Sequence, residues 1–421
     1  MKVALPYGKS TLTADVPDEN LMKIGLTSEL RAVKDARAEI TERLRKPIGT
    51  RPLSSLVGRG KRVVVIVDDY TRPCPDSILL PVILEELGRT GVRKEDVKII
   101  SATGLHPPRP DKLEETVGRE VLEEYDVVYH DAEGPEVVLF GRTSRGISVM
   151  VNRLVGEADF KISTGLIEPH FFAGFSGGRK SIMPGVSAGE SIFGNHGYRM
   201  IDDPRARAGI LEGNPVHEDA LEHANRAGLN FIVNVILNRD RRIGKIVAGD
   251  PTKAHEIGVE VDRRIVGVRF ERKADVTITT NSGYPLDLDL YQTVEGIDTA
   301  STITRDGGCI IVASECSSGI GPEKFRETYI EARSPDEVLG NIREDGPFEA
   351  QWQNQILARV QKNHKIYLVS SLQNRVVEEF MIKPADSVES ATDEALREAG
   401  RTAKIAVLPE GPAALPILAE S

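Results

Sequence analysis

The sequence predicts an α/β protein made of two α/β domains with mainly parallel sheets and an active site in the cleft between the domains. Continuous β-branched runs, such as KRVVVIVDD at 61–69, alternate with helical stretches. This pattern is typical of strands that are buried on both faces of a parallel sheet. The alternation starts a second time at KADVTITTNSG (273–283), which indicates a second α/β unit.

The first domain is predicted to cover residues 1–270. An amphipathic helix at 28–47, stopped by Pro47, precedes the first strand. Further helices are expected at 76–91 and 111–124, and one at 251–267 links the two halves. The expected strands lie at 61–69, 97–104, 125–131, 136–141, 146–152 and 158–168, followed by a hairpin of 230–238 and 242–250.

The second domain is predicted to cover residues 271–421, and its last residues are expected to pack back on the first domain. After the strand at 273–283, helices are expected at 290–302 and 348–362. The remaining strands are expected at 307–316, 364–372 and 404–411. Two sheets with facing strand ends place the site between the domains.

The composition is that of an ordinary globular chain, with 421 residues, 40% hydrophobic and 28% charged. The net charge is −10 and no long Lys or Arg run is present, so nucleic-acid binding is not expected. The sequence shows neither a signal peptide nor the roughly 18 apolar residues of a membrane span. Three cysteines (Cys74, Cys309 and Cys316) without CxxC spacing indicate a reducing compartment, and we expect a cytoplasmic protein.

Unusual polar residues follow several predicted strands. In open α/β sheets, ligands collect beyond the carboxyl ends of the strands, so these junctions are the places to search for a site. The junctions are DDYTRPCP (68–75), ATGLHPPRP (102–110), EPHFFAGFSGGRKS (168–181) and, in the second domain, NSGYPLDLDLYQ (281–292).

Lys180 follows a glycine-rich turn that nearly matches a phosphate-binding loop. The consensus requires Gly-Lys-Ser/Thr, but here Arg179 separates Gly178 from the lysine. Gly177 and Gly178 still allow backbone N–H groups to approach a phosphate closely. Lys180 is either a charge beside phosphate, a covalent anchor for a carbonyl cofactor, or a surface lysine.

Two of the eight histidines, His106 and His170, follow strands directly at the predicted mouth of the site. Their pKa range suits proton exchange at neutral pH, so they form a candidate acid–base pair on one substrate. His196, in FGNHG, is a possible single metal ligand. A zinc site built from all three histidines remains an alternative.

Further candidates surround these histidines. Arg72, three residues after Asp69, is placed to clamp a carboxylate through two N–H groups or to pair with Asp69. Tyr291, Gln292 and Glu295 share one helix face after the second-domain strand. Trp352, the only tryptophan, either caps a pocket or fills the core.

Taken together, the motifs resemble the lactate racemase family, whose cofactor is a nickel-pincer nucleotide. The matching segments occur in the family's order over nearly the whole chain. They are DDYTRPCP, ATGLH, EPHFFAGFSGGRKSIMPG, FGNHG, YPLDLDLYQ, QWQ and LPEGP. The resemblance implies a covalent bond between Lys180 and the cofactor, pyridinium-3-thioamide-5-thiocarboxylic acid mononucleotide, with His196 completing the square plane of Ni²⁺. It also implies cofactor-maturation enzymes as partners.

The resemblance further implies a reaction. One of His106 and His170 removes the hydroxyl proton of a 2-hydroxy acid while the α-hydrogen leaves as hydride, and the other histidine protonates the opposite face. Arg72 clamps the substrate carboxylate, Asp69 supports Arg72 or the cofactor, and Gln292 contacts the substrate. Tyr291 and Trp352 are expected to be substrate-binding residues as well.

Glu295 departs from the family pattern, because lactate racemase has a lysine at this place. An ionised carboxylate cannot donate to the substrate carboxylate, but it accepts hydrogen bonds from additional hydroxyls. We therefore predict a polyhydroxy (aldonic) acid such as D-gluconate, epimerised at C2, as the substrate. The alternatives are a racemase of short 2-hydroxy acids, a phosphate-loop kinase or transferase, and a metal-carrying binding protein without catalysis. The oligomeric state stays open.

Overall fold

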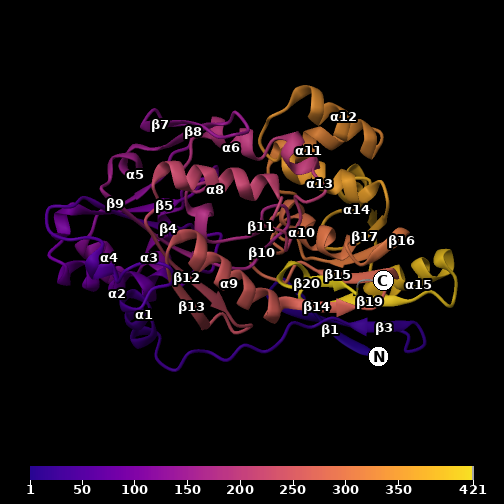
Figure 1. Ribbon diagram of the computed structural model, residues 1–421. Helices are drawn as coiled ribbons and strands as arrows, with labels where there is room; N and C mark the ends of the chain where they lie inside the picture. The colour runs from indigo at the N-terminus through magenta and orange to yellow at the C-terminus, as the bar shows by residue number, and fades with distance from the viewer. Residues whose placement is uncertain (420–421) are drawn as a thin grey trace.

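The β-branched runs of the first half form a six-stranded sheet in the order β13-β12-β9-β4-β5-β6 (Figure 1). Neighbouring strands are parallel from β12 to β6, whereas β13 pairs antiparallel with β12 in the predicted hairpin. The computed structural model describes residues 1–419. The strands are β4 (Val63–Asp68), β5 (Val97–Ala102), β6 (Val127–Tyr129), β9 (Phe160–Leu166), β12 (Phe231–Leu237) and β13 (Ile243–Gly249).

Helices cover both faces of this sheet, because successive side chains of a strand point to opposite sides. Val63 and Val65 of β4 pack in one core with α1 and α2, whereas Val64 and Ile66 pack in another core with α5, α8 and α9. The helices of this half are α1 (Ala36–Arg45), α2 (Asp76–Arg89), α3 (Leu113–Val117), α4 (Arg119–Glu124), α5 (Arg153–Glu157), α6 (Gly189–Asn195), α7 (Tyr198–Asp202), α8 (Pro215–Ala227) and α9 (Pro251–Val266).

Two of these helices differ from the prediction. α1 starts only at Ala36, because the side chain of Asp35 caps it by accepting a hydrogen bond from the N–H of Ala38 at 3.0 Å. The helix expected at 111–124 is divided into α3 and α4 at Gly118, whose φ of 88° interrupts the helical path.

The second half contains another six-stranded sheet, in the order β18-β17-β16-β15-β19-β3, with all neighbours parallel. Its strands are β3 (Leu21–Ile24), β15 (Ala274–Thr280), β16 (Thr304–Ala313), β17 (Lys365–Val369), β18 (Lys383–Pro384) and β19 (Ile405–Leu408). Its helices are α10 (Leu290–Ser301), α11 (Glu323–Ile330), α12 (Pro335–Asp345), α13 (Gln351–Gln361), α14 (Asn374–Glu379) and α15 (Val388–Ala399).

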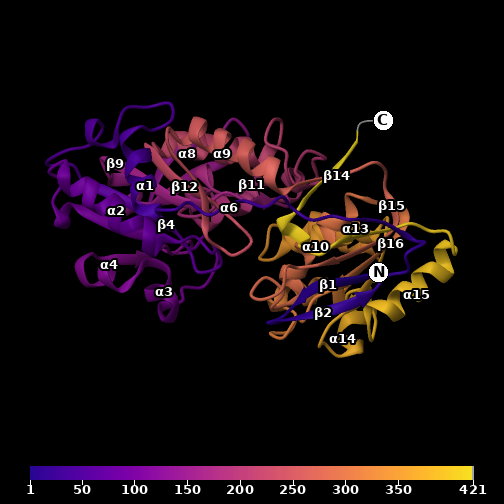
Figure 2. The same cartoon turned by 90° about the horizontal axis from the view of Figure 1, so that it is seen from below.

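The N-terminal residues depart from the expected division of the chain, which placed residues 1–270 in the first domain. β3 pairs with β19 and so completes the second sheet. The hairpin of β1 (Lys2–Tyr7) and β2 (Ser10–Asp15) packs in one core with β15 and α15 (Figure 2). The pairing of β3 with β19 joins segments more than 380 residues apart, which no local pattern reveals. The division of the chain into two domains stays a prediction.

Two further connections hold the halves together. β20 (Leu415–Leu418) pairs in parallel with β14 (Gly267–Phe270), and Leu415 shares a hydrophobic cluster with Phe175 of the first half. Phe171 and Phe172, which follow β9, lie in the main core of the second half together with α10 and α13. The loop after β9 is therefore anchored in both halves.

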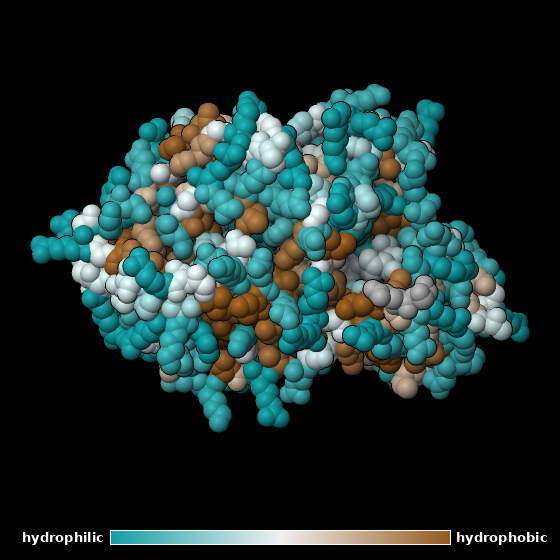
Figure 3. All heavy atoms as spheres, in the orientation of Figure 1, coloured by the Kyte–Doolittle hydropathy of each residue, from teal (hydrophilic) through white to brown (hydrophobic). Residues whose placement is uncertain are grey.

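Figure 3 shows a largely hydrophilic face with hydrophobic residues in limited patches. Among residues 1–419, no helix is both long and apolar enough to cross a membrane.

Candidate active site

Three neighbouring strands, β9, β4 and β5, direct their following loops to one edge of the first sheet, as the sequence predicts. The loop after β4 carries Asp69 and Arg72. Asp69 accepts hydrogen bonds from the N–H and the hydroxyl of Thr71 at 3.2 and 2.6 Å, and its carbonyl accepts from the N–H of Arg72 at 3.1 Å. This tight turn fixes the backbone of Arg72 at the sheet edge.

His106 lies in the loop after β5, and its Nδ1 is 2.7 Å from Oδ2 of Asp69. Asp69 is 4% exposed, whereas the side chain of His106 is 45% exposed. Burial alone would raise the pKa of Asp69, but the hydrogen bond and charge of His106, with Thr71 and Arg72, hold it below its usual value. The ionised Asp69 therefore accepts the Nδ1–H of His106, which leaves Nε2 as the atom that exchanges protons.

His170 ends the short strand β10 (Pro169–His170), which pairs with β11 (Gly174–Phe175). Its ring is buried, and Nδ1 accepts a hydrogen bond from the N–H of Ala173 at 3.2 Å. Burial, and then the positive charges of Lys180 and Arg72, keep the pKa of His170 well below its usual value. His170 is thus an uncharged imidazole in this state, in contrast to the carboxylate-paired His106.

Lys180 lies in a short helical turn at Gly178–Ser181, directly after Gly177. Burial, followed by the positive charges of Arg72 and Arg179, lowers its pKa well below the usual value of a lysine. An uncharged amine is the form that can attack a carbonyl carbon. This environment agrees with an anchoring lysine and not with a solvent-exposed surface lysine.

The glycine turn has φ angles of 73° at Gly177 and 55° at Gly178. A Cβ on Gly178 would lie 2.8 Å from the ring of His255, so a side chain does not fit there. The N–H of Gly178 donates to Oδ1 of Asn234 at 2.8 Å and is therefore not directed at a ligand. Gly178 therefore allows close packing of the loop against His255, and its role in binding a phosphate stays a prediction.

Arg179, which the sequence analysis did not select, is fully buried and holds the same loop. Its guanidinium donates to the carbonyls of Ala173 at 2.6 Å and Gly177 at 3.3 Å. Burial lowers its pKa to about 9, so it still carries its charge at neutral pH. The side chain fixes the loop that bears both His170 and Lys180.

His196 caps the C-terminal end of α6, and its ring lies between Phe172 and Trp352, at centroid distances of 5.0 and 5.4 Å. Its Nδ1 is 2.9 Å from Oδ1 of Asn195, whose Nδ2 in turn donates to Asp219 at 2.8 Å. This series of hydrogen bonds makes Nδ1 of His196 the protonated nitrogen and leaves the lone pair of its Nε2 free for a ligand. Burial lowers the pKa of His196 to about 3, so the ring is neutral.

The second half contributes the first turns of α10 and α13. Tyr291, Gln292 and Glu295 share one face of α10, as their spacing predicts. The indole Nε1–H of Trp352 donates to the hydroxyl of Tyr291 at 2.9 Å, so these two residues form one unit. Because Trp352 also contacts the ring of His196, the unit reaches the first half of the molecule.

Glu295 lies in the field of groups from the opposite half. Burial raises its pKa to about 7, Arg72 and Lys180 oppose this rise, and Glu168 adds to it. Arg72 itself forms an ion pair with Glu168, with Nη1 and Oε1 3.4 Å apart. The structure therefore brings Glu295 toward Arg72 and Lys180, as the motifs predict, and adds Glu168, which the sequence analysis missed.

The three histidines do not form a zinc site. Among residues 1–419, no group of three or more His, Cys, Asp or Glu side chains is placed to hold a metal ion. His106 is held by Asp69 and His196 by Asn195, so their protonated nitrogens serve different partners. The three cysteines are buried and reduced. The described residues therefore do not form the three-histidine zinc site that the sequence left as an alternative.

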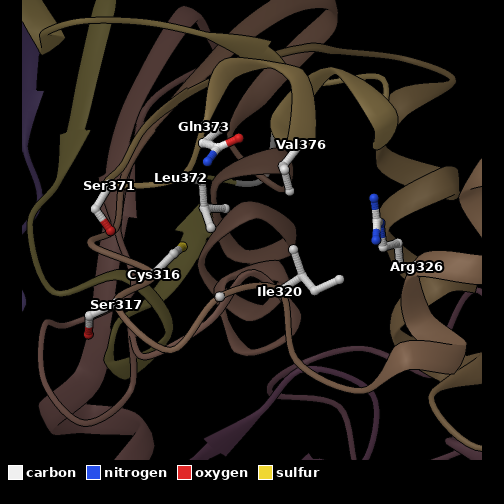
Figure 4. Close-up of a pocket in the computed structure, with 9 residues that line it drawn as sticks. Cys316, Ser317, Ile320, Arg326, Ser371, Leu372, Gln373 and Val376 are labelled. Atoms are coloured by element: carbon white, nitrogen blue, oxygen red, sulfur yellow. The ribbon is translucent and has the colours of Figure 1, made fainter.

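A separate cavity of about 420 Å³ lies at the carboxyl ends of β16 and β17, and none of the site histidines lines it (Figure 4). Cys316, Ser371 and Gln373 line it together with Ile320 and Arg326. Both guanidinium contacts of Arg326 go to Glu379, at 2.7 and 2.9 Å. Its cation is thus already neutralised, and the strand-end groups described above form the stronger candidate site.

Two family models match consecutive parts of the chain, the lactate racemase N-terminal domain at residues 7–209 and the lactate racemase C-terminal domain at residues 270–415. This chain belongs to the lactate racemase family. The chain is 39% identical to lactate racemase from Thermoanaerobacterium thermosaccharolyticum over 420 residues, covering 97% of each protein. It is 34% identical to lactate racemase from Lactiplantibacillus plantarum over 420 residues, covering 97% of this chain and 98% of the relative.

The lactate racemase fold is shared as well. The structure of the lactate racemase apoprotein from Thermoanaerobacterium thermosaccharolyticum matches with a TM-score of 0.93 at 37% identity, covering 99% of this chain and 100% of that one. The resemblance and the α/β fold class predicted from the motifs are confirmed. The protein is a racemase, and therefore an isomerase.

Proposed function

We propose that the protein inverts C2 of a 2-hydroxy acid with the help of a covalently bound nickel-pincer nucleotide, and that its substrate is a polyhydroxy acid such as D-gluconate. One observation carries the proposal. The buried imidazoles of His170 and His196 are neutral and lie near Lys180, whose pKa is well below its usual value. Arg72 lies beside them, and His106 is held at the same sheet edge. Family membership supports a racemase over the kinase and binding-protein alternatives.

The residues present fit this cofactor. A single neutral imidazole with its Nε2 lone pair free, at His196, suits a metal whose other donors come from the cofactor. The lowered pKa of Lys180 favours the unprotonated amine, which suits a covalent anchor. When bound, the cofactor supplies nickel and an acceptor that takes the α-hydrogen as hydride and returns it.

His106 and His170 supply the proton chemistry. On one face, Nε2 of His106 takes the hydroxyl proton, and Asp69 stabilises the imidazolium that results. On the other face, His170 acts from a buried position, where its Nδ1 accepts from the N–H of Ala173 and not from a carboxylic acid. Covalent attachment removes the charge of Lys180, so the pKa of His170 rises toward the range of an effective base. Two bases from different loops suit inversion at one carbon.

The remaining groups orient the substrate. Arg72 binds the carboxylate next to the reacting carbon, because its guanidinium lies beside His170 and Lys180. Gln292 contacts the substrate from α10. Tyr291 and Trp352 close the site as one hydrogen-bonded unit and exclude water. In this proposal Asp69 holds His106, and Gly177 and Gly178 permit the close packing behind Lys180.

Glu295 supports the polyhydroxy substrate. Its carboxyl has a pKa of about 7, so near neutral pH it exists in both protonation states and can either accept or donate a hydrogen bond. Once ionised, it repels an acid that has no hydroxyl beyond C2. We therefore expect the KM of the wild type for D-lactate, which has no hydroxyl beyond C2, to rise as pH rises above about 7. This rise should disappear in Glu295→Gln.

The test follows inversion at C2 and the fate of a C2 deuterium in D-gluconate and in D-lactate. The enzyme is loaded with nickel by preparing it with the cofactor-maturation enzymes. Both acids are offered with deuterium at C2, and inversion is followed by NMR and chiral chromatography. We expect inversion of D-gluconate with retention of deuterium at C2. Inversion of lactate alone would replace the polyhydroxy proposal by the short-chain alternative, and phosphate transfer from ATP without nickel would overturn the racemase proposal.

A further inference from the structure

Glu168 is held rigidly in the loop that carries His170, yet no step of the proposed reaction uses it. Its N–H donates to Oγ of Ser176 at 3.0 Å, and its carbonyl accepts from the N–H of Ser176 at 2.9 Å. Because both backbone groups of Glu168 are hydrogen-bonded, the position of its Cα, two residues before His170, is fixed. Such precision is typical of a side chain that acts in a site.

The carboxylate of Glu168 lies on one side of Arg72. The contact is single and long, 3.4 Å between Oε1 and Nη1, and both side chains are about one-third exposed. A bidentate pair would use two parallel bonds of about 2.7–2.9 Å. Glu168 therefore leaves N–H groups of Arg72 available for a substrate carboxylate, and it keeps acceptor sites of its own.

Glu295 approaches the same guanidinium from α10. Burial alone would lower the pKa of Arg72, but the negative charges of Glu168 and then Glu295 raise it above its usual value. Arg72 thus lies in the field of one carboxylate from each half of the molecule. A carboxylate substrate bound to Arg72 is repelled by both, unless other groups of the substrate donate hydrogen bonds to them.

Asp262 of α9 is a buried acid that lies near Glu168. Asp262 is 2% exposed, and its Oδ2 has no hydrogen-bond partner within residues 1–419. Burial, together with the charge of Glu168, raises the pKa of Asp262 to about 8. At neutral pH the buried acid is protonated, so Asp262 adds no negative charge beside Glu168. The carboxylate oxygens of Glu168 that do not contact Arg72 remain acceptors for hydroxyl groups.

We propose that Glu168 is a specificity-determining residue, which accepts hydrogen bonds from substrate hydroxyls beyond C2 and, with Glu295, disfavours acids that lack them. This inference rests on the proposed function and names the contact that recognises the polyhydroxy chain. Hydroxyl donors offset the repulsion between the substrate carboxylate and the two glutamates. A second carboxylate on the substrate would add to that repulsion.

The experiment compares Glu168→Gln with wild type in kcat and KM for D-gluconate and for D-lactate. We expect kcat/KM for D-gluconate to fall about tenfold or more, mainly through KM, since a hydrogen bond to a charged acceptor is weakened. For D-lactate we expect kcat/KM to stay unchanged or to rise, because one repelling charge is removed. Glu168→Asp should recover part of the D-gluconate activity. Glu39→Gln, which breaks an ion pair with Arg43 on α1, is the matched control and should change neither substrate.

A fall in kcat/KM for D-gluconate that is larger than any fall for D-lactate supports the inference, and the reverse order overturns it. Equal losses would show that Glu168 only positions Arg72, and equal gains would show that it acts only as a charge, so either result overturns it.

A binding measurement separates this inference from the proposed function. Should the wild-type enzyme invert neither acid, saturation-transfer NMR of D-gluconate with cofactor-free wild type and Glu168→Gln takes the place of kinetics. Signals from the C3–C5 protons that are lost in the variant support the inference even though the proposed function has failed. Equal signals in the two proteins, whether strong or absent, overturn it.

Discussion

At the scale of single residues, Asp69 decides how His106 works. The buried carboxylate accepts from Nδ1 at 2.7 Å and is itself fixed by Thr71. Asp69→Asn keeps the shape but removes the charge that stabilises the imidazolium. We expect kcat to fall by about 10²–10⁴ with little change in KM or in melting temperature. Steady-state kinetics and thermal denaturation check this, and an unchanged kcat would show that His106 does not need Asp69.

Asp262 provides a second prediction at this scale, concerning stability. Its folded pKa of about 8 lies above the usual value for an aspartate of about 4. An acid whose pKa is raised on folding stabilises the fold at low pH, and this stability is lost as pH rises from about 4 through 8. At pH 9 the free energy of unfolding of Asp262→Asn should therefore exceed that of the wild type by roughly 1 kcal/mol or more, and its melting temperature should be higher. The gain at pH 5 should be smaller.

Thermal denaturation at several pH values measures this difference. The exposed Asp306→Asn is the matched control and should show no such trend with pH. A gain for Asp262→Asn that does not depend on pH would contradict the assignment of the buried acid.

At the scale of elements, α13 connects the site to both halves. Gln351, Gln355 and Arg359, spaced four residues apart, donate to the carbonyls of His196, Tyr198 and Ile201 at 3.4, 3.0 and 3.2 Å. These three side chains lie on one face of the helix. The segment that carries His196 is therefore bound along this face of α13.

The bond from Trp352 to Tyr291 joins α13 to α10 and can be tested by a double-mutant cycle. Trp352→Phe and Tyr291→Phe each remove the bond while they keep an aromatic ring. We expect each variant to lower kcat/KM severalfold, and the double variant to lose little more than either one. Multiplied losses in the double variant would show that the two residues act independently.

The elements also show what the sequence can predict. The continuous apolar strands β4, β9 and β15 and the hairpin β12–β13 were predicted within a few residues, because they are long and have strong local patterns. The motifs likewise placed Asp69, His106, His170 and Lys180 at neighbouring strand ends. By contrast, β3 is short, and the strand it joins is distant in the sequence.

Glu168 and Arg179 were missed for a similar reason. Their roles depend on partners that only the folded loop brings near, Arg72 for Glu168 and the carbonyls of Ala173 and Gly177 for Arg179. No spacing in the sequence marks such contacts.

At the scale of the whole molecule, two mainly parallel sheets present strand-end loops to the candidate site. Phe171 and Phe172 anchor the loop of His170 in the core of the second half, while Arg179 fixes it from within. The candidate site therefore depends on residues from both halves and on Lys180, whose pKa is lowered by its surroundings. The proposed function depends above all on covalent attachment of the cofactor to this lysine.

Intact mass spectrometry of the wild type and of Lys180→Ala, each co-expressed with the cofactor-maturation enzymes, tests that claim most directly. We predict a single adduct on the wild type, located at Lys180 by peptide mapping and accompanied by stoichiometric nickel and inversion at C2. Lys180→Ala should lose the adduct and the activity together while it keeps the wild-type melting temperature within a few degrees. An unmodified wild type that inverts its substrate, or a Lys180→Ala variant that remains active, would contradict the account.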